Sequence, residues 1–212
     1  PKGWYFVSAN HQSWVDIFVL QHVLNGKIPF LKFFLKQELI RVPIMGQAWW
    51  ALDFPFMKRF SKSYLEKYPE MKGKDIETTQ NACKKFKYIP TSVMNFFEGT
   101  RFTPEKHAKQ KSPYKHLLNP KSGGFAFALN AMGDKFQSLL DCTIVYPEGI
   151  PSFADFMHGK IPKIIVRIRE VPIPADFCQG DYENDAEFKL QFQSWISDLW
   201  QYKDKEIDNL YK

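Results

Sequence analysis

The sequence predicts an α/β fold: a single domain with a mixed, mainly parallel central sheet flanked by helices. Short apolar strand patterns alternate with helical patterns along the 212 residues, and hairpin signals do not come in runs. No Pro/Gly-rich seam divides the chain, and its length suits one compact core. We therefore expect one domain over residues 1–212.

The chain opens with a strand pattern followed by a helix pattern. Residues 4–8 form a short, mostly apolar stretch that predicts a strand. Residues 13–24 predict a helix, and because apolar side chains lie on nearly every side of it, we expect that helix to be buried. A further apolar run follows at 29–35.

Prolines lie within or at the ends of the next predicted helices. We expect a helix around 37–49 that tolerates an early Pro43, and then a short apolar strand near 52–56. Residues 75–87 predict a helix, because an aspartate can cap its start and its apolar residues recur at helical spacing. A proline closes that helix before a strand over 92–97.

The second half of the chain adds a loop, two helices and two strands. Prolines and many lysines make 103–120 a basic surface loop. A glycine pair precedes a small apolar helix over 125–132, and strands are expected at 143–146 and 163–171. An amphipathic helix over 185–201 closes the domain.

Charge and composition limit the classes of partner and site. The chain has 29 Lys and Arg against 23 Asp and Glu, and its formal charge of +6 favours phosphates, nucleic acid or an anionic lipid surface. The lysines are dispersed among acidic residues without a recognised nucleic-acid motif, so we expect no nucleic-acid partner. Three cysteines without a C-x-x-C spacing and five isolated histidines predict a reducing compartment and no metal site.

A histidine and an aspartate near the first predicted helix form the first chemical motif. On a continuous helix His11 and Asp16 would lie about 140° apart, so they meet only if His11 precedes the helix, with Ser13 as its N-cap. The Asp16 carboxylate can then hold one imidazole nitrogen while the other accepts a proton from a hydroxyl nucleophile. The spacing from Ser13 to Asp16 equally fits a helix capping box, and the pattern alone leaves both interpretations open.

The second motif is Glu98-Gly99-Thr100-Arg101, directly after a predicted strand. Gly99 permits a positive φ or close backbone approach, and the planar guanidinium of Arg101 suits phosphate oxygens. An ordinary strand-to-loop turn with an exposed arginine is the alternative.

Together, the two motifs resemble the glycerolipid acyltransferase family, specifically the 1-acylglycerol-3-phosphate acyltransferases and related lysophospholipid acyltransferases. The segment 54–59 is similar to the family's second region, and Arg59 matches an arginine that contacts substrate phosphate there. Further similarity extends the resemblance over roughly residues 4 to 172, and the tail is similar to one bacterial branch. Phe97 stands where many members have proline, and Lys58 departs from the family pattern too, which leaves the accepted lysophospholipid open.

The resemblance implies an O-acyltransferase that moves a fatty acyl group from acyl-CoA or acyl carrier protein to the free hydroxyl of a lysophospholipid such as lysophosphatidic acid. It implies His11 as the general base, Asp16 as its orienting partner, and no cofactor beyond the acyl donor. The implied substrate-binding residues are Arg59, Glu98, Gly99, Thr100 and Arg101. For the oxyanion, backbone N–H groups near Gly99 or in the turn after His11 are candidates.

Membrane attachment is expected from the same resemblance. No stretch approaches 18 consecutive apolar residues, and the chain begins Pro1-Lys2-Gly3 directly before an apolar strand. We expect the cytoplasmic face of the cell's inner membrane, reached peripherally or through an upstream anchor, with an anionic lipid surface as partner. Aromatic residues from Phe30 to Phe54 offer an acyl-chain groove or plain core.

Three alternatives remain open at this stage. Glycerol-3-phosphate could be the acceptor, or another phospholipid the acyl donor. A non-catalytic phospholipid- or phosphate-binding module on the same fold is the alternative of a different class.

Overall fold

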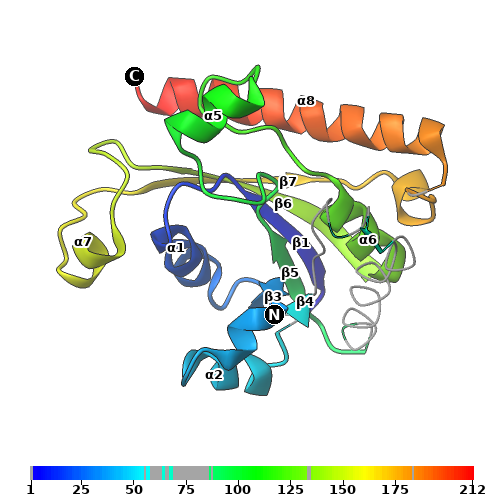
Figure 1. Ribbon diagram of the computed structural model, residues 1–212, viewed down its shortest axis with the longest axis horizontal. Coiled ribbons are helices and arrows are strands. Elements are labelled where there is room, and N and C mark those ends of the chain that lie inside the picture. Colours follow the sequence, from blue (N-terminus) through cyan, green and yellow to red (C-terminus); the bar gives the residue numbers. More distant parts are fainter. Residues whose placement is uncertain are drawn as a thin grey trace.

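A five-stranded sheet forms the centre of the computed structural model, which describes residues 2–54, 56–57, 64, 67–68, 86, 88–132, 135–182 and 184–212. Its strands, in the order β2-β5-β1-β6-β7 across the sheet, are β2 (Leu31–Phe33), β5 (Ser92–Asn95), β1 (Trp4–Ala9), β6 (Phe136–Val145) and β7 (Ile165–Val171) (Figure 1). The first four are parallel, and β7 runs antiparallel to β6. The predicted mixed, mainly parallel α/β sheet is confirmed.

Helices cover both faces of the sheet. Because successive side chains of a strand point to opposite faces, Phe6 and Val7 of β1 enter two different apolar cores. Phe6 packs with α6 (Gly123–Met132) and α8 (Ala186–Leu210), while Val7 lies in the core that contains α1 (Val15–Leu24). Figure 1 shows α8 above the sheet and α1 below it.

Helix α1 is buried on one side alone. Val15, Val19 and Leu20 are in the core, but Trp14, just before the helix, and Phe18 are 50% and 44% exposed. The expectation of a fully buried helix is therefore wrong on the side that carries Trp14 and Phe18. Phe18 lies next to α7 (Phe153–Met157), since its ring lies 5.8 Å from the Phe153 ring and 5.3 Å from the Phe156 ring.

The single helix expected around 37–49 is instead two short elements. A 3-10 helix spans Gln37–Arg41, and α2 begins at Met45 and ends at Ala51. Pro43 lacks an N–H and disfavours a helical conformation for Val42, and Ile44 adopts a φ of 65°. The backbone therefore breaks between the two elements rather than continuing through the proline.

The loop expected over 103–120 contains α5 (Pro104–Gln110). The Thr103 hydroxyl accepts a hydrogen bond from the Lys106 N–H, and Pro104 occupies the first helical position, where its missing N–H costs nothing. Pro104 is thus a helix-start signal at this position, and counting it as a loop residue was wrong.

The remaining predicted elements are present with different ends, whereas α7 and a 3-10 helix over Ala175–Cys178 were not predicted, and residues 52–53 form a turn instead of the start of the expected strand. β6 and α8 are longer than predicted, and the short parallel pair β3 (Leu35–Lys36) and β4 (Phe56–Met57) forms a second sheet. The helix predicted over 75–87 lies outside the described residues, except for the buried Phe86. Within the described ranges, no helix combines the length and the apolar character needed to cross a membrane.

Candidate active site at the carboxyl ends of β1, β5 and β6

The site lies where three neighbouring parallel strands end. His11 follows β1, Glu98 follows β5 and Tyr146 follows β6, so the strand order brings together residues that are far apart in the sequence. Side chains just beyond the carboxyl ends of parallel strands commonly form binding sites in α/β folds. Asn10 fixes the ends of two of these strands, since its side-chain amide exchanges two 2.8 Å hydrogen bonds with the main chain of Ile144.

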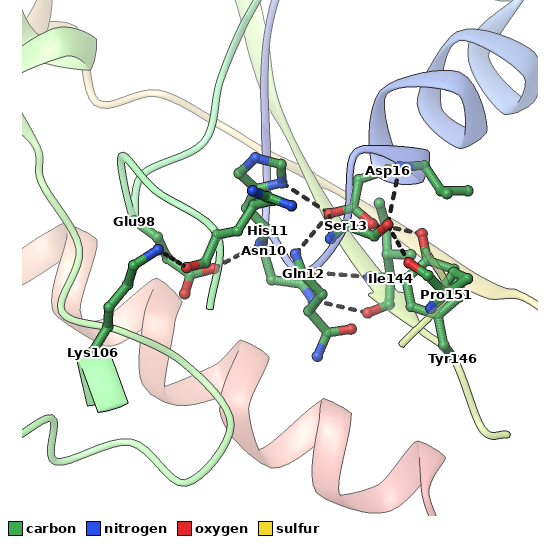
Figure 2. A network of polar contacts seen from close by, with 12 residues as sticks. Asn10, His11, Gln12, Ser13, Asp16, Glu98, Lys106, Ile144, Tyr146 and Pro151 are labelled. Carbon is green, nitrogen blue, oxygen red and sulfur yellow. Dashed lines mark hydrogen bonds and ion pairs between the residues drawn. The ribbon is translucent and has the colours of Figure 1, made fainter. Parts of the chain in front are cut away.

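His11 and Asp16 are hydrogen bonded, as the spacing argument requires. The distance from His11 Nδ1 to Asp16 Oδ2 is 2.9 Å, and the Asp16 side chain is 1% exposed. The same Oδ2 accepts the N–H groups of Gln12 and Ser13 at 2.7 and 2.9 Å, so the turn before α1 wraps around one carboxylate oxygen (Figure 2). The positive end of the α1 dipole further favours a negative charge here.

The helix start differs from the expected one. Trp14, not Ser13, is the residue at the boundary, and no side chain caps it. The Ser13 hydroxyl instead accepts the N–H of Val15 at 3.2 Å and donates to Pro151 O at 2.7 Å. Only the carboxylate half of a capping box is present, and that same carboxylate holds the imidazole. The two interpretations of the motif therefore describe a single arrangement.

The two ring nitrogens of His11 differ in their partners. Nδ1 is bonded to Asp16, and within the described part of the chain no group bonds to Nε2. The imidazole stacks on Phe96, with ring centroids 3.8 Å apart and planes inclined by 12°, and its side chain is 13% exposed. An imidazole held on one edge and one face, with its other nitrogen open, has the geometry of a general base.

Glu98 is buried and binds main chain. Its Oε1 accepts the N–H of His11 at 2.7 Å, and its Oε2 accepts the N–H of Leu118 at 2.9 Å. Burial raises the pKa of the Glu98 carboxyl from 4.5 to about 7, although both N–H groups favour the charged form. Since Trp200 of α8 donates to Leu118 O at 3.0 Å, a chain of contacts links α8 to the backbone of His11.

Three cationic side chains gather around the turn after Glu98. Gly99 has a positive φ of 67°, one of the two possibilities that the motif left open, and a Cβ there would lie 3.2 Å from the Lys121 ammonium. Lys106 Nζ donates to Thr100 Oγ1 and to Arg101 O at 2.8 and 2.9 Å. The Arg101 guanidinium lies 5.5 Å from the centre of the Trp14 ring. These cations form a patch beside His11 that suits an anionic group.

Some of the backbone N–H groups that could stabilise the oxyanion already have acceptors within the protein. The N–H groups of Gln12 and Ser13 bond to Asp16, and that of Gly99 bonds to Phe96 O at 2.9 Å. Among the described residues, no acceptor is found for the N–H groups of Thr100 and Arg101.

Sequence reasoning assigned no role to several residues now seen at the site. They are Phe96, Lys106, Lys121 and Tyr146. The Lys-rich character of 103–120 was a signal for Lys106, but nothing local links Tyr146 to position 16. Arg59 lies outside the described residues, so its expected contact with phosphate stays a prediction. Of the proposed groove aromatics, Phe33 and Phe54 are buried in the core, whereas Phe30 and Trp50 are exposed.

Comparison with known proteins shows the family to which the chain belongs. The sequence profile of the acyltransferase family matches residues 1–150, which include both motifs. The chain belongs to the acyltransferase family. Relatives of this acyltransferase chain include human 1-acyl-sn-glycerol-3-phosphate acyltransferase delta, 26% identical over 97% of this chain and 53% of the human protein.

Two further relatives have a similar sequence identity to this acyltransferase chain. The mouse 1-acyl-sn-glycerol-3-phosphate acyltransferase gamma is 28% identical over 95% of this chain and 56% of its own length. The 2-acyl-1-lysophosphatidylinositol acyltransferase of Saccharomyces cerevisiae is 26% identical over 96% and 60%. The chain thus spans little more than half the length of these relatives, and all three are eukaryotic.

Proposed function

We propose that this protein transfers a fatty acyl group from an acyl thioester, acyl-CoA or acyl carrier protein, to the free hydroxyl of a lysophospholipid such as lysophosphatidic acid. The observation that carries the proposal is the hydrogen bond from His11 to Asp16, which leaves Nε2 of the imidazole open beside a cationic patch. The relatives, which are named as acyltransferases of lysophosphatidic acid and lysophosphatidylinositol, support the same acceptor class.

In the proposed reaction His11 acts as the general base. Nε2 takes the proton of the acceptor hydroxyl as its oxygen attacks the thioester carbonyl, and Asp16 stabilises the imidazolium that results. Collapse of the tetrahedral intermediate breaks the C–S bond, and the thiolate leaves with the proton from His11. No covalent acyl-enzyme forms, so the step needs one base and one set of oxyanion donors. The N–H groups of Thr100 and Arg101 are the donors we propose.

The cationic patch would hold the phosphate of the acceptor. Arg101, Lys106 and Lys121 surround the Gly99 turn, where the missing Cβ lets the Lys121 side chain approach the backbone. Fixing the phosphate there places the glycerol hydroxyl near Nε2, and positioning of this kind supplies much of the rate. Glu98 would act on the backbone of His11, although direct contact with the acceptor, which the resemblance implies, stays a prediction.

An anionic membrane surface is the partner that we propose for the exposed apolar patch, defined by Trp14, Phe18, Phe153 and Met157. All four side chains are exposed, and Figure 1 shows α1 and α7 together at one end of the molecule. Arg101 lies over Trp14, and Lys160 and Lys163 follow α7 in the sequence. Aromatic side chains flanked by cations are typical of surfaces that rest on lipid.

Vesicle co-sedimentation tests the membrane contact. We expect the double variant Phe153→Ser/Met157→Ser to lose binding to vesicles rich in phosphatidylserine, while Leu190→Ser, an exposed apolar change on α8, binds as the unaltered protein does. Equal binding by all three proteins would remove the patch from the proposal. A place on the cytoplasmic face of the inner membrane and membership of a bacterial branch of the family stay predictions, and the eukaryotic relatives do not favour the second.

Mass-spectrometric detection of product tests the activity itself. The protein is incubated with lysophosphatidic acid and either oleoyl-CoA or oleoyl carrier protein, beside His11→Ala and the matched control His22→Ala, an exposed histidine of α1. We expect phosphatidic acid from the unaltered protein and from His22→Ala, and none from His11→Ala. Folded protein that binds the lysolipid but forms no product with either donor would favour the non-catalytic binding module.

A further inference from the structure

Tyr146 makes a buried contact with the catalytic pair that neither motif contains. It directly follows β6 and is 1% exposed, and its Oη donates to Asp16 Oδ1 at 2.6 Å. The bond spans 130 residues of sequence. Figure 2 shows Tyr146 on one side of the Asp16 carboxylate and His11 on the other.

The two carboxylate oxygens of Asp16 have separate partners. Oδ2 accepts His11 Nδ1 and the two N–H groups of the turn, whereas Oδ1 accepts the Tyr146 hydroxyl, and no other donor to Oδ1 is found in the described part of the chain. A carboxylate at 1% exposure has little water to replace a lost donor. The Tyr146 hydroxyl therefore determines whether Oδ1 is satisfied.

The hydroxyl is fixed as a donor. Burial, together with the nearby charge and hydrogen bond of Asp16, raises the pKa of the Tyr146 phenol far above its ordinary value. The phenol stays protonated at any pH at which the protein works, and its proton faces Oδ1. Its ring packs in the apolar core with Val15 and Ile144, which holds the hydroxyl in place.

We propose that Tyr146 is a positioning residue for acyl transfer, whose hydroxyl holds the Asp16 carboxylate so that Oδ2 faces His11 Nδ1. The expected change in kcat rests on the proposed function, whereas the expected change at His11 does not. Without the hydroxyl, Oδ1 is buried without a donor, and the carboxylate can turn away from the imidazole. Its uncompensated charge also holds a proton on the His11–Asp16 pair more strongly.

The variant Tyr146→Phe removes one oxygen and keeps the ring in the core. We expect kcat to fall about tenfold, the size expected for one hydrogen bond to a buried charge, while KM for the lysophospholipid stays within about twofold. The midpoint of the acidic limb of the kcat profile moves to higher pH, because an undonated carboxylate favours the protonated pair. If Tyr146 only stabilised the fold, Tyr146→Phe would leave the midpoint of the pH profile and the ratio of kcat to KM unchanged.

Tyr114→Phe is the matched control. Tyr114 is another buried tyrosine, and its hydroxyl bonds to Ser197, away from His11. We expect Tyr114→Phe to lower the melting temperature without changing kcat or the pH profile. The proposal is overturned if Tyr146→Phe keeps the kcat and pH profile of the unaltered protein, or if Tyr114→Phe changes them equally.

An NMR titration of the His11 ring separates this proposal from the proposed function. The His11 signal is assigned by its absence in His11→Ala, and its midpoint is followed with and without Tyr146→Phe. A higher midpoint in Tyr146→Phe supports the positioning role even if no acyl transfer is detected. An unchanged midpoint refutes that role even if acyl transfer is active.

Discussion

Replacing Glu98 with glutamine tests how the protein uses a buried carboxyl group whose pKa is raised. The two oxygens of Glu98 accept the N–H groups of His11 and Leu118 at 2.7 and 2.9 Å, and the residue is fully buried. Glutamine has the same shape but offers one oxygen and one NH₂, so one backbone N–H faces another donor. An unpaired buried donor costs about 1–3 kcal/mol of the free energy of unfolding.

The pH dependence of this cost follows from the pKa of Glu98. In the folded protein Glu98 keeps its proton up to about pH 7, whereas in the unfolded chain it releases the proton near its ordinary value of 4.5. The folded state binds more protons between those values, so this contribution to stability is complete below the lower pKa and is lost as pH rises through the higher one. The difference corresponds to about 3 kcal/mol.

Urea unfolding of both proteins at several pH values between 4.5 and 8 measures the effect. Glutamine does not ionise, so subtracting the two curves removes the titration of all other groups. We expect the unaltered protein to be about 2 kcal/mol more stable near pH 5, and this advantage to disappear or reverse by pH 8. Stability curves that run parallel across this range would show that Glu98 has an ordinary pKa, and the reasoning would fail.

Three other substitutions give further expectations. Asp16→Asn should lower kcat about a thousandfold, because a neutral amide does not stabilise the imidazolium, and steady-state kinetics beside a melting curve would detect a trivial folding defect. Lys203→Met removes the buried ammonium that lies 2.6 Å from Asp141, and we expect a loss of about 3 kcal/mol, seen as a melting temperature lower by about 6–12 °C. An unchanged melting temperature contradicts that estimate. Lys121→Gln should raise KM for lysophosphatidic acid about tenfold while leaving kcat nearly constant, and a fall in kcat alone would place Lys121 outside the phosphate site.

Local patterns predicted the elements whose boundaries depend on neighbouring residues. The strand before His11 and the helix after it follow from apolar spacing, and the separation of five residues required His11 to precede the helix. The predicted helix boundaries were wrong at two prolines, because a proline can either interrupt a helix or begin one. Pro43 breaks a helix that was expected to tolerate it, and Pro104 starts a helix where a loop was expected.

The sequence by itself determined the α/β class and the condition that His11 must precede the helix in order to meet Asp16, because both depend on patterns of residues a few positions apart. Only the tertiary structure decided that Tyr146 reaches Asp16 and that Glu98 holds the backbone of His11. These contacts depend on β1 lying between β5 and β6. That order results from packing helices on both faces of one sheet, a property of the whole chain that no short window of sequence contains.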